Sequence, residues 1–189
     1  MLRLRPYKEA DAGVIVNWLG DEFGFRQWSA DRYDRFPITA ADMNAMYERM
    51  SREIVFFPVT AVDGSGIAGH LIMRYTDSEK KTLRLGFVII DPEKRGRGLG
   101  KEMIRLALDE AFGALGAEKV TIGVFENNPQ AYHCYKAAGF RDAPAGKPEY
   151  FHVLGEDWKC LELYLSAGER AISAGPASGA AKHADDKTI

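Results

Sequence analysis

Glycines and basic residues alternate from Arg95 to Lys101, in the order Arg-Gly-Arg-Gly-Leu-Gly-Lys. The apolar run Leu85–Ile90 precedes them, and a segment with helical spacing of apolar residues follows. A glycine-rich turn between a strand and a helix leaves backbone N–H groups free at the helix N-terminus, where the dipole favours anions. The glycines also let a pyrophosphate approach the backbone, because no Cβ is in the way. The segment therefore predicts a phosphate-binding loop made of Arg95, Gly96, Arg97, Gly98, Leu99, Gly100 and Lys101.

The spacing decides among the known phosphate loops. A Walker A loop requires glycine at the position of Arg95 and a hydroxyl residue at the position of Glu102, so neither requirement is met. The dinucleotide fingerprint G-x-G-x-x-G fails as well, because the glycines follow one another at every second position. The pattern that does fit is R/Q-x-x-G-x-G/A, with Arg95, Gly98 and Gly100 on its fixed places. A basic surface turn without a ligand remains the alternative.

A second pattern lies downstream, between residues 128 and 140. Asn128 and Pro129 are well suited to begin a helix, as N-cap and first residue. An apolar stripe with helical spacing follows, and it includes Tyr135. Gly139 suits the left-handed position that ends a helix, and Phe140 follows it. The sequence thus reads Asn-x-x-Ala, a tyrosine four residues later, and Gly-Phe.

Together the two patterns resemble the GNAT superfamily of N-acetyltransferases. The resemblance implies a mixed α/β sheet, in which an antiparallel meander is followed by one parallel βαβ crossover and strands four and five splay apart. It also implies that acetyl-CoA is the co-substrate, with its pyrophosphate on the loop and its pantetheine arm along Val88, Ile89 and Ile90. Asn128 would hold a pantetheine amide, although helix capping alone explains an asparagine there.

The hydrophobic pattern agrees with this order of elements. Strands are expected at residues 2–5, 58–62, 67–75, 82–90, 119–124 and 158–165, and helices at residues 9–19, after Thr39, at 99–115 and after Asn128. The expected domain spans residues 1–165. Residues 166–189 are rich in Ala, Gly, Ser, Lys and Asp without apolar periodicity, so they are expected to form a disordered tail.

Tyr135 is the expected general acid. Acetyl transfer to an amine expels a thiolate, which gains from a proton or hydrogen-bond donor, and a phenol has a suitable ordinary pKa of about 10. A core tyrosine on the apolar stripe is the alternative reading.

The general base is not fixed by the sequence. In the branch of the superfamily that acetylates the N-termini of ribosomal proteins, a glutamate on strand five serves, and here that place falls on Gly123. Glu126, Glu149 and His152 are the alternatives, together with a relay through water. The missing glutamate also leaves open a second function, that of a non-catalytic acyl-CoA sensor or interaction module.

The amine acceptor, on a small molecule or a protein, is expected to meet the segment 21–36. There, carboxylates and aromatic rings interleave, with Trp28 and Asp31 as the expected contacts. A loop whose aromatic residues merely cover the core explains the same pattern.

Composition limits the remaining choices. A chain of 189 residues can build one domain with a sizeable core, and a net charge of −2 argues against nucleic acid as a general partner. No apolar run approaches membrane-span length and the N-terminus resembles no signal peptide, so a membrane partner is not expected. Two separate cysteines, Cys134 and Cys160, fit a cytoplasmic protein without a metal site. The sequence leaves open whether the chain forms a homodimer.

Overall fold

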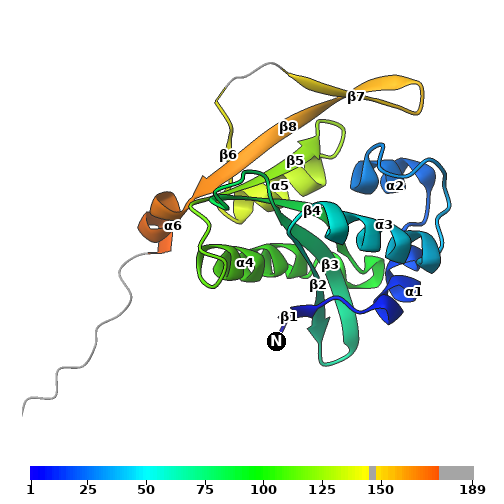
Figure 1. Ribbon diagram of the computed structural model, residues 1–189, viewed down its shortest axis with the longest axis horizontal. Helices are drawn as coiled ribbons and strands as arrows, with labels where there is room; N and C mark the ends of the chain where they lie inside the picture. The colour runs from blue at the N-terminus through cyan, green and yellow to red at the C-terminus, as the bar shows by residue number, and fades with distance from the viewer. Residues whose placement is uncertain (145–147, 175–189) are drawn as a thin grey trace, which may run out of the picture.

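A mixed sheet organises the computed structural model, which describes residues 1–144 and 148–174. In this part of the chain the sheet has eight strands, in the order β1-β2-β3-β4-β5-β8-β6, and β7 pairs with β8. Their bounds are β1 Arg3–Pro6, β2 Phe56–Asp63, β3 Gly66–Tyr75, β4 Thr82–Ile90, β5 Lys119–Phe125, β6 Arg141–Asp142, β7 Glu149–Val153 and β8 Glu156–Ser166. All neighbours are antiparallel except β4 and β5, so the predicted meander with one parallel crossover is confirmed (Figure 1).

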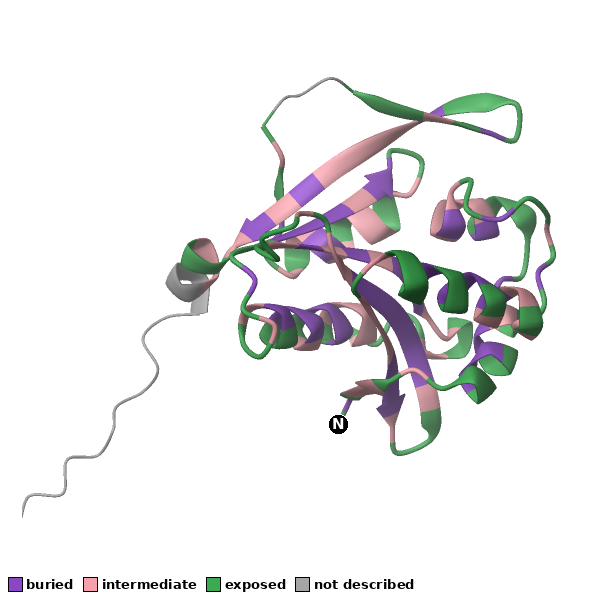
Figure 2. Ribbon diagram, viewed as in Figure 1, coloured by how far each residue is buried: buried purple, intermediate pink, exposed green. Residues whose placement is uncertain are grey.

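Helices cover both faces of this sheet (Figure 1). The first face, called here the α4 face, packs against α4 (Leu99–Phe112) and α5 (Pro129–Ala137). The other, the α3 face, packs against α1 (Ala12–Ile15), α2 (Glu22–Ser29) and α3 (Ala40–Glu53). Figure 2 shows the resulting burial, with the central strands buried and the β7–β8 hairpin exposed toward its tip.

The parallel strands separate partway along their length. Their pairing runs from Thr82 opposite Lys119 to Leu85 opposite Ile122 and then stops. Just beyond this point β4 has one residue more than β3 between two paired positions, which is a β-bulge. Phe87 lies in the bulge with a left-handed φ of 48°. The bulge redirects β4 while it stays paired to β3, so the predicted splay of strands four and five is confirmed.

The two helices that border the splay begin as their sequences predict. Gly98, with a left-handed φ of 78°, is the N-cap of α4 and offers no side chain to cap it. The Asn128 side chain caps α5 by accepting a hydrogen bond from the Ala131 N–H at 3.1 Å. Pro129 occupies the first position of α5, where its missing N–H is no loss.

Two expected segments near the N-terminus are corrected. The helix expected over residues 9–19 is broken into the 3₁₀ turn η1 (Glu9–Asp11), α1 and the 3₁₀ turn η2 (Val16–Trp18). The segment 21–36 is not a plain loop, because α2 begins in it. Asp21 caps this helix by accepting a hydrogen bond from the Gly24 N–H at 2.7 Å. Asp is a favoured N-cap, but Gly24 and the aromatic residues lower the helix propensity and hide the signal.

The expected tail is wrong for its first residues. β8 reaches Ser166, and α6 spans Ala167–Ala174. Ser166 and Glu169 form a capping box: the Glu169 carboxylate accepts from the Ser166 N–H at 3.2 Å, and the Ser166 hydroxyl accepts from the Glu169 N–H at 3.3 Å. The Ser-x-x-Glu spacing in the sequence is typical of such a capping box. The rest of the expected tail, residues 175–189, lies outside the described residues.

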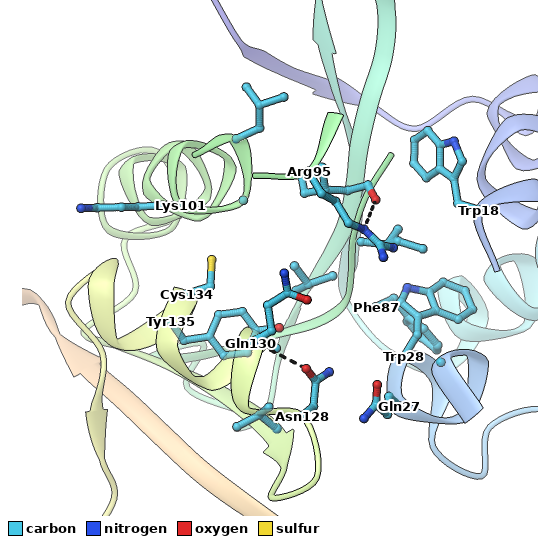
Figure 3. A pocket seen from close by; sticks show the side chains of 18 of the residues that line it. Trp18, Gln27, Trp28, Phe87, Arg95, Lys101, Asn128, Gln130, Cys134 and Tyr135 are labelled. Atoms are coloured by element: carbon cyan, nitrogen blue, oxygen red, sulfur yellow. Dashed lines mark hydrogen bonds between the residues drawn. The ribbon is translucent and has the colours of Figure 1, made fainter. Parts of the chain in front are cut away.

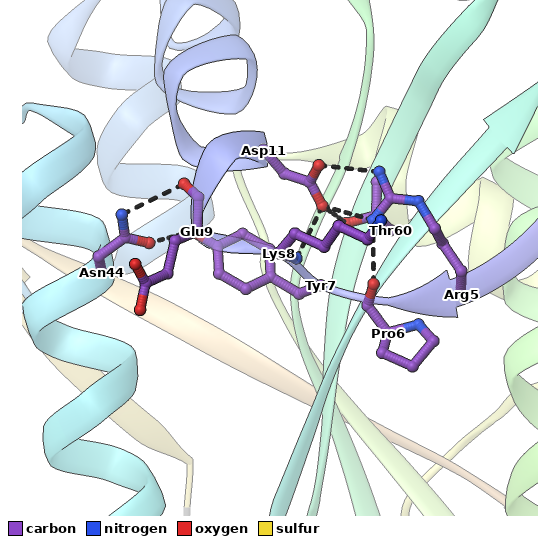
Figure 4. A network of polar contacts seen from close by, with 8 residues as sticks. All are labelled: Arg5, Pro6, Tyr7, Lys8, Glu9, Asp11, Asn44 and Thr60. Atoms are coloured by element: carbon purple, nitrogen blue, oxygen red, sulfur yellow. Dashed lines mark hydrogen bonds and ion pairs between the residues drawn. The ribbon is translucent and has the colours of Figure 1, made fainter.

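A buried carboxylate fastens the first helical turn to the sheet (Figure 4). Asp11, only 4% exposed, accepts two hydrogen bonds from the Arg5 guanidinium, at 2.6 and 2.8 Å. It also accepts from the Thr60 hydroxyl at 2.7 Å and from the Lys8 N–H at 2.9 Å. Burial by itself raises the pKa of Asp11, but the bonds from Arg5, Lys8 and Thr60 outweigh it and lower the pKa below its usual range.

We predict that Asp11→Asn lowers the free energy of unfolding at pH 7 by about 3 kcal/mol, because it leaves Arg5 without its counter-ion. Since the pKa of Asp11 is lower in the folded state, its contribution is complete above the unfolded-state pKa of about 3.9. It is lost as the pH falls through the folded-state pKa. In urea unfolding between pH 7 and pH 3, the difference in the free energy of unfolding between the wild type and Asp11→Asn should therefore decrease toward low pH.

The control is Asp31→Asn, because the Asp31 side chain is 62% exposed and its carboxylate makes only a long ion pair, 3.7 Å from the Arg32 guanidinium. Its effect should stay within about 0.5 kcal/mol. An Asp11→Asn cost that does not depend on pH would show that the ionised carboxylate is not what stabilises this turn.

Candidate active site

The splay of β4 and β5 opens into a cleft of about 410 Å³ (Figure 3). Most of the residues predicted to bind the co-substrate line this cleft: Val88, Ile89, Ile90, Arg95, Gly96, Gly98, Leu99, Gly100, Lys101 and Asn128. Tyr135 and Trp28 line it as well. Arg97 and Asp31 are not among the lining residues, although Gly96 and Gly98 on either side of Arg97 are. Asp31 is directed to solvent, so its predicted contact with an acceptor is not supported by its position.

The glycine loop forms one end of the cleft. Gly96 and Gly98 both have left-handed φ angles, 76° and 78°, which glycine adopts without strain. The first N–H groups of α4 have no partner within the helix, and no side chain caps them. Arg95 is held against β4, because its Nε donates to the Ile90 carbonyl at 3.2 Å. This arrangement fits a pyrophosphate, with N–H donors at a positive helix end and guanidinium and ammonium groups beside it.

A second feature of the loop keeps α4 and α5 close together. A Cβ on Gly100 would lie 3.2 Å from the Cys134 sulfur and 3.7 Å from the Ile90 side chain. Glycine at this position therefore lets the first turn of α4 pack directly on α5. The same close packing explains why the loop and Tyr135, the next residue after Cys134, border one cleft.

Tyr135 extends from α5 toward the point where the strands part (Figure 3). Its side chain is buried, with 7% exposed, and yet it lines the cleft. Burial raises the pKa of Tyr135 well above its usual value of about 10, so the phenol stays protonated at neutral pH. The tyrosine can therefore donate a hydrogen bond into the cleft. It also packs in the core, as the alternative reading of this residue expects.

An ion pair occupies the place where a strand-five glutamate would stand. Gly123 lines the cleft, and the Arg84 guanidinium of β4 crosses above it to reach Glu162 of β8, at 2.6 and 2.7 Å. A Cβ on Gly123 would lie 2.5 Å from Arg84 Nη2. A side chain at this position would therefore require the Arg84 guanidinium to move. Neither Arg84 nor Glu162 is marked by a sequence pattern, because the pair joins residues 78 positions apart.

None of the side chains predicted as the general base lines the cleft. Glu126 is 61% exposed and paired with Lys159, whereas His152 is 73% exposed and paired with Asp157. Glu149 is exposed on β7. A base role for these three residues is therefore not supported by their positions, and a relay through water is the alternative that remains.

The segment 21–36, expected to meet the acceptor, contributes one wall of the cleft through α2, but sequence reasoning did not single out Gln27 or Trp18. Asp21 and Gln27 line it from this helix, and Trp18 does so from η2. Gln27 also donates to the Asn127 carbonyl and side-chain oxygens, at 3.0 and 3.1 Å, which ties α2 to the loop before α5. Trp28 packs its ring on Phe87 of the bulge with centroids 4.7 Å apart.

Comparison with known proteins assigns the class. The model of the acetyltransferase (GNAT) family matches residues 15–140, so the chain belongs to this family. It is an acetyl-CoA-dependent N-acetyltransferase, and the alternative of a non-catalytic acyl-CoA sensor is not favoured.

The individual relatives carry one common name. The chain is 27% identical to the spermidine N(1)-acetyltransferase of Escherichia coli K12, over 74% of this chain and 72% of that enzyme. It is 36% identical to the Vibrio cholerae enzyme of the same name, but only over 34% of this chain and 37% of that enzyme. A crystal structure of V. cholerae spermidine N-acetyltransferase with CoA and spermine superposes with a TM-score of 0.75, 21% identity, and coverage of 89% and 96% of the two chains. Another structure of that enzyme is described as dodecameric. At this identity the likeness shows the fold alone.

Within residues 1–144 and 148–174, none of the helices is both long and apolar enough to span a membrane. The described residues also contain no group of three His, Cys, Asp or Glu side chains placed to hold a metal ion.

We predict that Gly98→Asp weakens CoA binding at least about tenfold, because it places a negative charge beside the pyrophosphate site. The matched control is Gly116→Asp, at the far end of α4. Both glycines have left-handed φ angles, 78° and 64°, and open space where a Cβ would stand, so the backbone strain is similar. Calorimetric titration with CoA should separate the two variants. Equal dissociation constants for both would remove the loop from the site.

Proposed function

We propose that this protein transfers the acetyl group of acetyl-CoA to a primary amine by direct attack within a ternary complex. The observation that carries the proposal is a single cleft that joins the glycine loop, the separated backbone of β4 and Tyr135. Phosphate, pantetheine amide and thioester could each meet groups of suitable chemistry along this cleft. The thioester supplies an activated acetyl group, and the protein's own groups bind and orient it.

The β4 backbone supports the cofactor's position. Beyond Leu85 the edge of β4 that faces β5 has no strand partner, so the backbone of Val88–Ile90 can pair with the amides of a pantetheine arm. A backbone N–H near Val88 would also polarise the thioester carbonyl, and a fixed donor of this kind stabilises the oxyanion of the transition state.

Tyr135 acts on the leaving group in this proposal. The departing sulfur carries negative charge, and the protonated phenol donates a hydrogen bond to it. Because burial raises the pKa of Tyr135, donation of a hydrogen bond is favoured over complete proton transfer. The amine loses its proton to water, since the predicted carboxylate and imidazole bases lie outside the cleft.

The state of Cys134 supports direct attack rather than an acetyl-enzyme. This thiol lines the cleft, but burial raises its pKa, and the thiolate is the nucleophilic form. A ternary complex predicts intersecting lines in double-reciprocal plots when both substrates are varied. A covalent intermediate on Cys134 would give parallel lines instead.

The function is tested by measuring the CoA thiol that is released when the protein acts on acetyl-CoA and each member of a panel of amines. The panel includes spermidine, because the relatives are named for it, together with short diamines, amino acids and a peptide with a free N-terminus. Turnover with at least one amine is expected. Binding of acetyl-CoA without turnover of any acceptor would favour the sensor over the enzyme.

We predict that Tyr135→Phe lowers kcat by about 10²- to 10⁴-fold and leaves the dissociation constant of CoA nearly unchanged. Tyr132→Phe is the matched control on the same helix, because its hydroxyl donates to Asp142 at 2.9 Å, away from the cleft. Steady-state kinetics and calorimetry on both variants provide the comparison. Native turnover in Tyr135→Phe would leave Tyr135 with a packing role alone.

A further inference from the structure

We propose that the amine acceptor is a small amino acid, whose carboxylate is bound by Arg74 and Arg84 on the α3 face of the sheet. This inference rests on the proposed function and specifies its substrate class. It starts from a group that neither the fold nor the acetyl transfer explains, the guanidinium of Arg74.

Arg74 and Arg84 stand side by side. They are paired residues on the antiparallel strands β3 and β4, so their side chains leave the same face of the sheet. Ile72, two residues before Arg74, packs in the core under α3, whereas Leu83 and Leu85 pack against α4. Because side chains alternate along a strand, both arginines lie on the α3 face.

The two arginines differ in their partners. Arg84 is neutralised by Glu162 through two hydrogen bonds. Arg74 is half-buried, and among the described residues no carboxylate lies within ion-pair distance of it. Burial lowers the pKa of Arg74, and the charges of Arg84 and Arg32 lower it further, whereas the Glu162 carboxylate raises it to a smaller extent. A desolvated cation beside two other cations is costly unless an anion joins it.

Arg74 and Arg84 are not themselves among the residues that line the cleft, but they lie beside two residues that do. Gly86 follows Arg84 by two residues on the same face and lines the cleft. Gly123 lines it as well, and the Arg84 guanidinium crosses directly over Gly123. The arginine pair therefore adjoins the place where β4 and β5 part, on the side of the sheet that α2 and α3 cover.

A carboxylate is the anion that suits this place. A guanidinium binds a carboxylate through two parallel hydrogen bonds, and such charge-assisted bonds are strong where water is partly excluded. An amino acid could place its carboxylate on Arg74 while its amine reaches the thioester. A polyamine carries only positive charge and would be repelled by Arg74, whereas Arg84 is already neutralised by Glu162.

Matched pairs of acceptors test the proposal. L-ornithine and putrescine differ only in the carboxylate, and so do L-lysine and cadaverine. For the wild type we expect kcat/KM to be about tenfold or more higher for the amino acid of each pair. Arg74→Gln should lower kcat/KM for the amino acids by about tenfold to a hundredfold and leave the diamines unchanged.

Arg52→Gln is the control for the loss of one positive charge, because the Arg52 side chain is 73% exposed on α3. It should leave all four acceptors unchanged. The melting temperature of Arg74→Gln should not fall, because the substitution removes an unpaired cation beside two others. A lower melting temperature with equal losses for both members of each pair would mean that Arg74 merely supports the fold, and it would overturn the proposal.

Binding measurements distinguish a failure of this inference from a failure of the proposed function. Calorimetric titration of L-ornithine and of putrescine into the CoA-saturated protein requires no turnover. Tighter binding of L-ornithine that is lost in Arg74→Gln supports the carboxylate site even if no amine is acetylated. Turnover of putrescine or spermidine in preference to L-ornithine would keep the proposed function and overturn the carboxylate site. Absence of binding and of turnover for both amino acids would overturn it as well.

Discussion

The separation of β4 from β5 is the constraint on which the rest of the structure depends. The pairing of these two parallel strands ends at Leu85 and Ile122. Beyond that point, in the described part of the chain, the backbone donors and acceptors on their facing edges have no strand partner. Such groups are costly inside a protein unless a ligand or water takes them. The protein can keep this edge open because β4 stays paired with β3 on its other side. The cleft is therefore a property of the sheet's backbone, and side chains only refine it.

Aromatic packing holds the separated strands in place. Phe87 has a left-handed backbone, which is strained for a bulky residue. Its ring packs against Trp28, and the Phe25 ring lies beneath the same tryptophan. On the other strand, Phe125 packs against Trp158, which also contacts Phe23 of α2. Thus α2 braces both strands beyond the point where their pairing ends. Among the aromatic residues of segment 21–36, Phe25, Tyr33 and Phe36 pack in the core, whereas Trp28 packs there and also lines the cleft.

The parts of the site that are local in sequence could be predicted from it. The glycine loop and the asparagine-capped helix each depend on a few neighbouring residues, whose backbone preferences fix the conformation. The strands and helices of the meander and the crossover could be located from their hydrophobic patterns, and the family resemblance implied their arrangement. The broken helix over residues 9–19 could not be predicted, because Asp11 turns inward to Arg5 and Thr60 through tertiary contacts. Helix α2 was missed for a related reason, since its weak intrinsic propensity is offset by packing.

Gly123 shows most clearly why sequence alone did not reach the chemistry of the site. Read along the chain, it is a glycine where a glutamate would be expected, which indicates a lost catalytic group. In the folded protein, the missing Cβ admits the Arg84 guanidinium, which carries positive charge over β5 to Glu162. The carboxylate thus comes from β8 and is already neutralised, while Arg74 adds a cation that has no carboxylate within ion-pair distance in the described part of the chain. The charge beside this part of the sheet is therefore positive where a glutamate would have made it negative. In our proposal, a change of that sign selects among acceptors, because a cationic amine is repelled unless it also carries an anion.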